Sequence, residues 1–224
     1  GAGTDAIEYA LNNSKVSCID LGEDQVELTR INFKARNLDY DEIKIGNAEN
    51  LQFEDANFDL VYSFGVLHHT PNIQKTADEI HRVLKDDGVA LIMLYSRGWK
   101  HYVKRCFVHG ILKGKIFKYN FNWQKIYNEV SEVNGSSPLT KVYTKKEIKN
   151  IFSKFDSIEI SRDRMGEFFE YRPYNTVKFP DFITKLLNLF SIYKIFGENW
   201  KIKLKKRVST NKKTKLRDVF FKHY

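Results

Sequence analysis

The chain is poor in cysteine and has no long hydrophobic run. Cys18 and Cys106 are its two cysteines, and neither lies close to a second cysteine or to a histidine at metal-binding spacing. This pattern excludes a zinc motif and a disulfide framework, and it is typical of thiols that stay reduced in the cytoplasm. The most apolar segment, residues 89–95, is far shorter than the roughly 20 residues of a membrane-spanning helix. We therefore expect a cytoplasmic protein with no metal site, no transmembrane segment and no secretory signal.

The composition nevertheless suits a folded domain. Hydrophobic residues make up 42% of the 224 residues and aromatic residues 14%, which is enough to build a sizeable core. A disordered chain would have fewer apolar residues. The length fits one α/β domain with an elaboration.

Charge is distributed unevenly along the chain. Residues 1–97 contain 9 Lys and Arg against 17 Asp and Glu, a balance of −8, whereas residues 98–224 contain 28 against 11, a balance of +17. Such an asymmetry indicates an acidic partner for the basic half. The alternative is a compositional bias, because Lys, Asn, Ile and Phe are common throughout the chain.

Hydrophobic periodicity in the first hundred residues predicts alternating helices and strands. The pattern indicates a helix at 5–14, a strand at 15–21, a helix at 23–37, strands at 42–47 and from 58, a helix at 76–84 terminated by 85–88, and a strand at 89–95. Strands that alternate with helices at this spacing predict a parallel, doubly wound sheet, so the expected fold class is α/β.

The second half is less regular. Residues 98–134 combine bulky aromatic side chains with lysines and are expected to form helices and loops, followed by a break at 134–138. Beyond it the sequence predicts a helix at 144–155 with a Thr144–Glu147 capping box, a strand at 156–161, an amphipathic helix at 181–196, an edge strand at 199–208 and a loosely held tail.

Three features of the first half suit a nucleoside ligand. Gly1 and Gly3 precede a helix, where the backbone can turn tightly and N–H groups can bind a carboxylate or phosphate. Asp20 ends the next strand, and a carboxylate there can accept hydrogen bonds from both ribose hydroxyls. Asn47 and Glu49 follow the strand after it and could hold an adenine amino group.

A fourth feature, residues 58–72, ends a strand in a turn at Gly65, just before His68 and His69. In open α/β sheets, ligands bind outside the carboxyl ends of the parallel strands, and all four features are expected there. A glycine turn with a strand-end acid also fits a nicotinamide-dependent oxidoreductase, although no second nucleotide-binding half follows.

Four segments of this half also occur, in the same order and spacing, in one enzyme family: GAGTD (1–5), VSCIDLGEDQVELTR (16–30), GNAENLQFEDANFDLVYSFGVLHHT (46–70) and EIHRVLKDDGVALIMLY (79–95). Over about residues 1–97 the chain resembles the type 11 class I methyltransferases, a group that includes quinone-biosynthesis methyltransferases. The resemblance implies a Rossmann-like fold with an antiparallel closing strand. It also implies S-adenosylmethionine as cofactor and methyl transfer to a small-molecule or lipid-like acceptor.

The resemblance further implies a cofactor site built from residues that follow the strands. They are Gly1 and Gly3 in a three-glycine loop, Asp20 at the ribose, Leu21 beside the adenine, Asn47 and Ala48 at the adenine amino group, and Phe64 and Gly65 along the methionine portion. The family usually has Asp where this chain has Asn47. Because an amide oxygen can also accept a hydrogen bond, we expect altered affinity rather than loss of binding.

One part of the family pattern is absent from the sequence. The family has a central strand ending in an acidic residue directly before the glycine loop, and this sequence starts at the loop. We therefore expect a chain truncated at its N-terminus, in which neighbouring strands close up or another segment takes the strand's position. Cofactor affinity should then be poor, and an exposed sheet edge would favour a homodimer.

His68 and His69 are candidate catalytic residues. A histidine titrates near neutral pH and can take a proton from a hydroxyl or amine acceptor, and we favour His69 in this role. The alternative is that one histidine packs under the loop and the other faces solvent, since methyl transfer can proceed by positioning alone.

The sequence thus predicts a methyltransferase core at 1–97, a helical aromatic and basic cap at 98–150, the end of the core at 151–208 and a tail at 209–224. We interpret the cap as a lid over a substrate pocket rather than as a nucleic-acid or lipid-binding surface. Two further functions remain open: a cofactor-binding protein without activity, and a methyltransferase that modifies nucleic acid.

Overall fold

The computed structural model describes residues 2–98, 102, 106–131, 139–162 and 199–207. The chain divides into two compact units, Gly1–Glu54 and Asp55–Tyr224. The helix expected at 181–196 and the tail at 209–224 lie outside the described residues. No helix among the described residues is long and apolar enough to cross a membrane.

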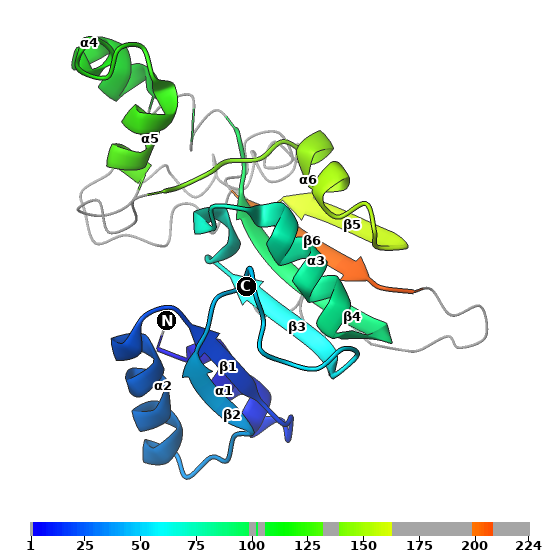
Figure 1. Cartoon of the computed structure of the whole chain (residues 1–224). Helices are drawn as coiled ribbons and strands as arrows, with labels where there is room; N and C mark the ends of the chain where they lie inside the picture. The colour runs from blue at the N-terminus through cyan, green and yellow to red at the C-terminus, as the bar shows by residue number, and fades with distance from the viewer. Residues whose placement is uncertain (1, 99–101, 103–105, 132–138, 163–198, 208–224) are drawn as a thin grey trace, which may run out of the picture. The chain divides into compact units, whose positions relative to one another are not determined.

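The first unit is a small α/β element with a core of its own (Figure 1). Along the chain it consists of α1 (Thr4–Leu11), β1 (Ser17–Asp20), α2 (Glu23–Ala35) and β2 (Glu42–Ile45). The two strands pair in parallel, with Ser17 opposite Glu42 and Asp20 opposite Ile45. Both strands therefore end at the same edge of this sheet, so that side chains following them lie close together.

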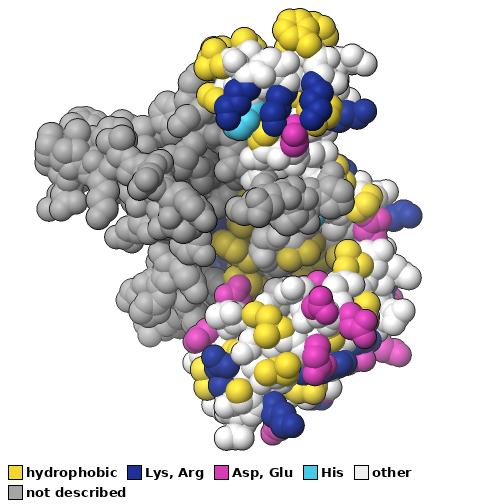
Figure 2. All heavy atoms as spheres, turned by 90° about the vertical axis from the view of Figure 1, so that its left-hand side faces the viewer, with side chains coloured by type: hydrophobic (Ala, Val, Ile, Leu, Met, Phe, Trp, Pro, Cys, Tyr) yellow, Lys and Arg dark blue, Asp and Glu magenta, His cyan; other side chains and the backbone are white. Residues whose placement is uncertain are grey.

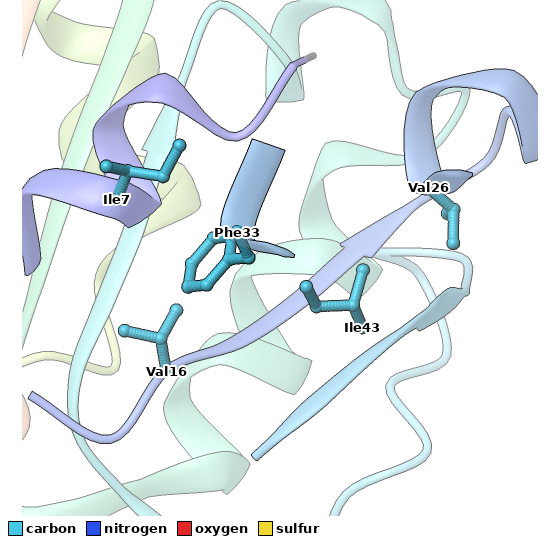
Figure 3. Close-up of a cluster of buried hydrophobic side chains, with 5 residues drawn as sticks. All are labelled: Ile7, Val16, Val26, Phe33 and Ile43. Carbon is cyan, nitrogen blue, oxygen red and sulfur yellow. The ribbon is translucent and has the colours of Figure 1, made fainter. Parts of the chain in front are cut away.

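The core of the first unit combines apolar side chains from both helices with side chains on or next to the strands. Val26 and Phe33 lie seven positions apart on α2, which places them on the same helical face. They pack with Ile7 of α1, Val16 before β1 and Ile43 of β2 (Figure 3). Phe33 is fully buried, and truncating it would remove the largest member of this cluster.

The second unit is built on a four-stranded sheet in the order β3-β4-β6-β5. Its strands are β3 (Phe58–Phe64), β4 (Leu84–Tyr95), β5 (Ser157–Arg162) and β6 (Asn199–Lys205). β3 and β4 are parallel and joined through η1 (Leu67–His69) and α3 (Ile73–Val83), whereas β6 runs antiparallel to both β4 and β5. The predicted alternation of strands and helices is confirmed, and so is the antiparallel late strand.

The remaining helices of the second unit are η3 (Phe107–Leu112), α4 (Lys115–Lys118), α5 (Trp123–Ser131) and α6 (Lys145–Ile151). The capping box predicted for α6 is present, because the Thr144 hydroxyl accepts the Glu147 N–H while the Glu147 carboxylate accepts the Thr144 N–H. Burial opposes ionisation of Glu147, but hydrogen bonds from Thr144 and the Arg97 guanidinium hold its pKa below its ordinary value.

Residues 85–88 do not terminate a helix as predicted. α3 already ends at Val83, and the segment belongs to β4 as an irregularity in its pairing with β3. Leu84 is opposite Phe58 and Val89 is opposite Leu60, so β4 contains three extra residues between these pairs. Gly88 permits the tight turn, because a Cβ there would lie 2.8 Å from the Lys85 carbonyl oxygen.

The strand predicted at 199–208 is not an edge strand. β6 lies between β4 and β5, with Ile202 opposite both Ile92 and Ile160. In β6, buried apolar residues alternate with half-buried lysines, which indicates that one face of the sheet is covered. A period of two carries no information about whether a strand has one neighbour or two, which is why the sequence interpretation was wrong.

The described strands form two separate sheets, β1-β2 and β3-β4-β6-β5. Within the described part of the chain, β1 pairs with β2 alone and β3 with β4 alone. The expectation that neighbouring strands close up, or that another segment takes the position of the strand before the glycine loop, stays a prediction.

Candidate functional site

Gly3 shapes the loop before α1. Its φ of 73° lies in the left-handed region, and its carbonyl accepts the Ile7 N–H at 3.0 Å to open the helix. A Cβ on Gly3 would lie 2.5 Å from Cγ2 of Thr29 in α2. The Asn32 side chain of the same helix donates to the Ala2 carbonyl at 2.8 Å, so α2 holds this loop closely. Gly1 lies outside the described residues.

Asp20 stands at the carboxyl end of β1, where the sequence predicts a ribose-binding acid. Its Oδ1 accepts the Gly22 N–H at 3.0 Å, and its backbone carbonyl accepts the Gly46 N–H at 2.9 Å. These bonds fix the carboxylate at the edge where β1 and β2 both end. The next residue, Leu21, is 71% exposed, so an apolar side chain reaches solvent directly beside the acid.

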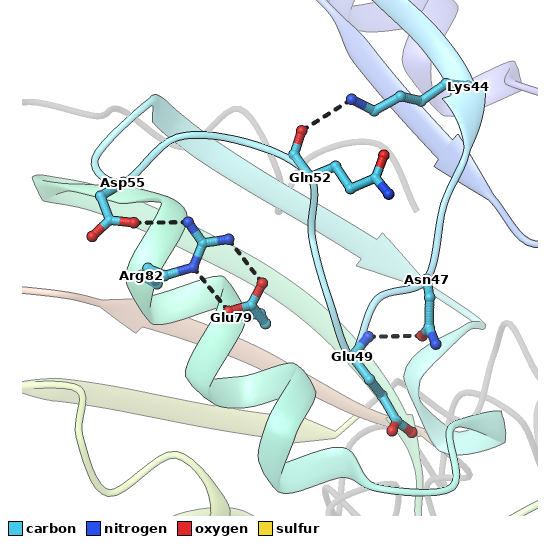
Figure 4. A network of polar contacts seen from close by, with 7 residues as sticks. All are labelled: Lys44, Asn47, Glu49, Gln52, Asp55, Glu79 and Arg82. Carbon is cyan, nitrogen blue, oxygen red and sulfur yellow. Dashed lines mark hydrogen bonds and ion pairs between the residues drawn. The ribbon is translucent and has the colours of Figure 1, made fainter.

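Asn47 and Ala48 lie in the turn that follows β2. The Asn47 Oδ1 accepts the Glu49 N–H at 2.9 Å, which forms a local turn (Figure 4). An amide oxygen has two lone pairs, so this oxygen can accept one further hydrogen bond. Ala48 is half-buried. The first unit therefore brings Asp20, Leu21 and Asn47 to the ends of two paired strands.

Phe64 and Gly65 follow β3 in the second unit. Phe64 is largely exposed and stacks on Tyr62, with ring centroids 6.0 Å apart. Gly65 has a φ of 80°, while the nearest atom to a Cβ there would be the Met93 methyl group at an ordinary 3.9 Å. The conformation of the turn, rather than lack of space, thus requires glycine at this position.

His68 and His69 form the 3-10 turn η1 and have different surroundings. His68 is fully buried, and its ring stacks on Tyr95 at a centroid distance of 3.7 Å. Its carbonyl accepts the Lys141 N–H. His69 is half-buried, and its Nδ1 lies 2.8 Å from the Leu139 carbonyl oxygen and 3.4 Å from the Thr140 hydroxyl.

The contact with Leu139 determines the tautomer of His69. A carbonyl oxygen can only accept, so Nδ1 carries the hydrogen in the neutral ring and Nε2 carries the lone pair. Helix α5 supports this arrangement, because the Gln124 side chain donates to the Thr140 carbonyl at 2.7 Å and the Thr140 N–H donates to Asn128 Oδ1 at 3.1 Å.

Sequence reasoning missed the role of residues 139–143. This segment supplies the carbonyl that orients His69, and its Tyr143 forms a parallel bridge with Ser96 at the end of β4. The interactions use main-chain groups, which every residue has, and therefore leave no signature in the sequence. The Ser96 and Tyr143 hydroxyls are buried, and neither has a hydrogen-bond partner among the described residues.

The surroundings of Arg82, Cys18 and Cys106 are structural rather than catalytic. Arg82 donates to both oxygens of Glu79 and to Asp55 at the start of the second unit (Figure 4). Burial raises the pKa of both cysteine thiols, Cys18 and Cys106, to about 11, so neither is a thiolate at neutral pH. Among the described residues, no group of three His, Cys, Asp or Glu side chains is arranged to hold a metal ion.

The first unit also has a hollow that lies away from the predicted cofactor residues. It has a volume of about 520 Å³ and is lined by α2 together with Ile45. Its charged lining residues are Glu23, Asp24, Glu27 and Arg30. None of the predicted cofactor residues contributes to it.

The residues after β1 and β2 fit the nucleoside part of S-adenosylmethionine. A carboxylate suits two ribose hydroxyls, and an exposed leucine suits the face of an adenine.

The chain matches a methyltransferase family, and known proteins with similar sequences include named methyltransferases. The profile of a family described as a methyltransferase domain matches residues 1–92. The chain is 30% identical over 172 residues to an uncharacterised protein of Methanocaldococcus jannaschii, covering 74% of this chain and 59% of that protein. It is 34% identical over 101 residues to a ubiquinone/menaquinone biosynthesis C-methyltransferase of Citrifermentans bemidjiense, covering 43% of each chain.

The fold is also that of known methyltransferases. A SAM-dependent methyltransferase of Methanosarcina mazei matches with a TM-score of 0.58 at 17% identity, covering 93% of this chain and 90% of that one. This similarity confirms the predicted Rossmann-like α/β fold. The chain spans less than two thirds of the length of both relatives compared by sequence. Residues 1–92 of the chain thus match a methyltransferase-domain family, and the relative from Citrifermentans bemidjiense is itself named as a methyltransferase.

Proposed function

We propose that this protein binds S-adenosylmethionine and transfers its methyl group to a lipid-like or other small acceptor. The observation that carries the proposal is the Asp20 carboxylate, fixed by the Gly22 N–H at the end of β1 within a methyltransferase domain. The name of the Citrifermentans bemidjiense relative refers to quinone biosynthesis, which supports an apolar acceptor.

The described residues have separate tasks in this proposal. Asp20 accepts hydrogen bonds from the ribose, Leu21 covers one face of the adenine, and Asn47 accepts a hydrogen bond from the adenine amino group. Phe64 and Gly65, which belong to the second unit, are assigned to the methionine portion by the family resemblance alone. S-adenosylmethionine supplies an electrophilic methyl group on a sulfonium, so the chain has to orient the acceptor and manage its proton.

His69 is the proposed general base. With Nδ1–H donated to the Leu139 carbonyl, the ring would receive the acceptor's proton at Nε2. His68 is less suited to this role, because it is fully buried and stacked on Tyr95. Burial raises the pKa of Tyr143 to about 12, so its buried hydroxyl stays protonated at neutral pH.

The orientation of His69 can be tested without knowing the acceptor. Long-range ¹H–¹⁵N spectra of labelled protein at pH 8 should show the Nδ1–H tautomer for His69, the less common form of free histidine. His69→Gln identifies the signals, since Gln retains a donor but has no ring. A spectrum with Nε2 protonated instead would contradict the proposed role.

Thermal unfolding with added ligands tests the function as a whole. S-adenosylmethionine and S-adenosylhomocysteine should raise the unfolding midpoint by about 5–10 °C at a concentration of about 100 times Kd. NADH should leave the midpoint unchanged, and this control separates the methyltransferase from a nicotinamide-dependent oxidoreductase. Stabilisation by NADH alone would refute the proposal.

A further inference from the structure

Helices η3 and α4, with the turn before α5, expose a group of large apolar side chains. We call it the α4 surface, and its members are Phe107, Ile111, Leu112, Phe117 and Phe121. Phe117 is 73% exposed, Leu112 68% and Phe121 65%. Exposed apolar groups of this size mark a surface that contacts another molecule, whereas the interpretation of the segment as a lid stays a prediction.

The backbone holds these side chains outward. Phe121 has a φ of 61°, a conformation that a bulky side chain rarely adopts, and its ring meets that of Phe117 edge to face at 5.9 Å. Gly110 faces inward on η3, where a Cβ would lie 2.5 Å from the Trp123 ring. The inner side of the segment is thus closely packed while the outer side presents apolar groups.

The segment that carries the apolar group is also basic. Lys113, Lys118 and Lys125 are exposed and Lys115 is half-buried, whereas Glu129 is the only acid among residues 106–131. Glu129 lies within 4 Å of both Lys115 and Lys118 and accepts a hydrogen bond from Tyr119. These contacts lower the pKa of Glu129, so it is ionised at neutral pH, and the segment still keeps a positive net charge. Figure 2 shows hydrophobic side chains together with a row of basic ones on the part that contains α4 and α5.

We propose that the α4 surface docks on an anionic lipid bilayer, with Phe117, Phe121 and Leu112 entering the interface and the lysines contacting acidic headgroups. Exposed aromatic and aliphatic side chains beside a row of lysines match the boundary between acyl chains and charged headgroups. A second copy of the chain is a poor occupant of a symmetric contact, because it would bring the same lysines together. The bases of a single-stranded nucleic acid would stack on the aromatic rings, but the exposed aliphatic side chains Ile111 and Leu112 would find no stacking partner there.

Vesicle flotation of the whole chain tests this proposal. The protein should float with vesicles of phosphatidylcholine and phosphatidylserine and much less with phosphatidylcholine alone. The variant Phe117→Gln/Phe121→Asn should reduce binding about tenfold or more, since Gln suits a helix and Asn suits a positive φ while both remove apolar surface. Lys113→Gln should reduce it about fivefold. The matched control is Leu28→Ser/Ile31→Ser, which removes two exposed apolar side chains from α2 and should bind as wild type.

Each alternative gives a different result. Absence of flotation with acidic vesicles, or equal flotation of the Phe117→Gln/Phe121→Asn variant, would overturn the proposal. Tighter binding of a fluorescent single-stranded RNA that depends on the same phenylalanines would assign the surface to nucleic acid instead. Concentration-dependent self-association in sedimentation, lost in that variant, would assign it to a second copy. Circular dichroism of each variant verifies that its fold is intact.

Discussion

Asp20→Ala is expected to weaken binding of S-adenosylhomocysteine by at least about 100-fold. Each hydrogen bond from a ribose hydroxyl to a carboxylate contributes about 1.5–3 kcal/mol, and the variant loses two of them. The carboxylate already accepts the Gly22 N–H, which fixes its orientation before the ligand arrives. Isothermal titration calorimetry on wild type and variant measures the change directly.

A second substitution of Asp20 separates the effect of its charge from that of its hydrogen-bonding oxygen, and a control variant accompanies it. Asp20→Asn keeps an oxygen for the Gly22 N–H but loses the charge, so its affinity should lie between wild type and Asp20→Ala. Asp41→Ala is the matched control in the same unit, because Asp41 is held by Lys15 at 2.7 Å and by Ser17. It should bind as wild type. Equal dissociation constants for Asp20→Ala and wild type would contradict the assignment of the ribose acid.

The sequence allowed the elements of the first hundred residues to be predicted because their signals are local. The period of apolar residues locates α2 and β1, and Thr144 with Glu147 predicts the start of α6. The strand-end position of Asp20 follows from the same patterns. All of these depend on neighbours within a few residues along the chain.

Other features depend on contacts between distant residues and could not be predicted. The Leu139 carbonyl lies 70 residues from His69, and any side chain at position 139 could provide it. The interior position of β6 depends on which strands flank it, and residues 85–88 fall within β4 because Leu84 before them and Val89 after them both pair with β3. The exposure of Phe117 and Phe121 likewise contradicts the usual burial of aromatic residues.

Gly3→Ala is expected to lower the free energy of unfolding of the first unit by about 2–5 kcal/mol. An alanine at a φ of 73° costs about 1–2 kcal/mol, and forcing its Cβ against Thr29 at 2.5 Å costs about 1–3 kcal/mol more. Urea unfolding followed by far-ultraviolet circular dichroism should reveal the change. Fluorescence should change less, because all three tryptophans lie beyond residue 54.

The matched control is Gly22→Ala, at a glycine with a φ of −87° where a Cβ would lie 3.3 Å from the flexible Gln25 side chain and at an ordinary 3.7 Å from Asp20 Oδ1. It should change the unfolding free energy by no more than about 0.5 kcal/mol. Adding Thr29→Ala to Gly3→Ala removes the clashing methyl group and should restore the steric part of the loss, but not the part due to the backbone conformation. A double variant no more stable than Gly3→Ala would mean that backbone conformation alone requires glycine in this loop. Full restoration would mean that the approach of α2 requires it, and that a less bulky residue at position 29 would free the loop to vary.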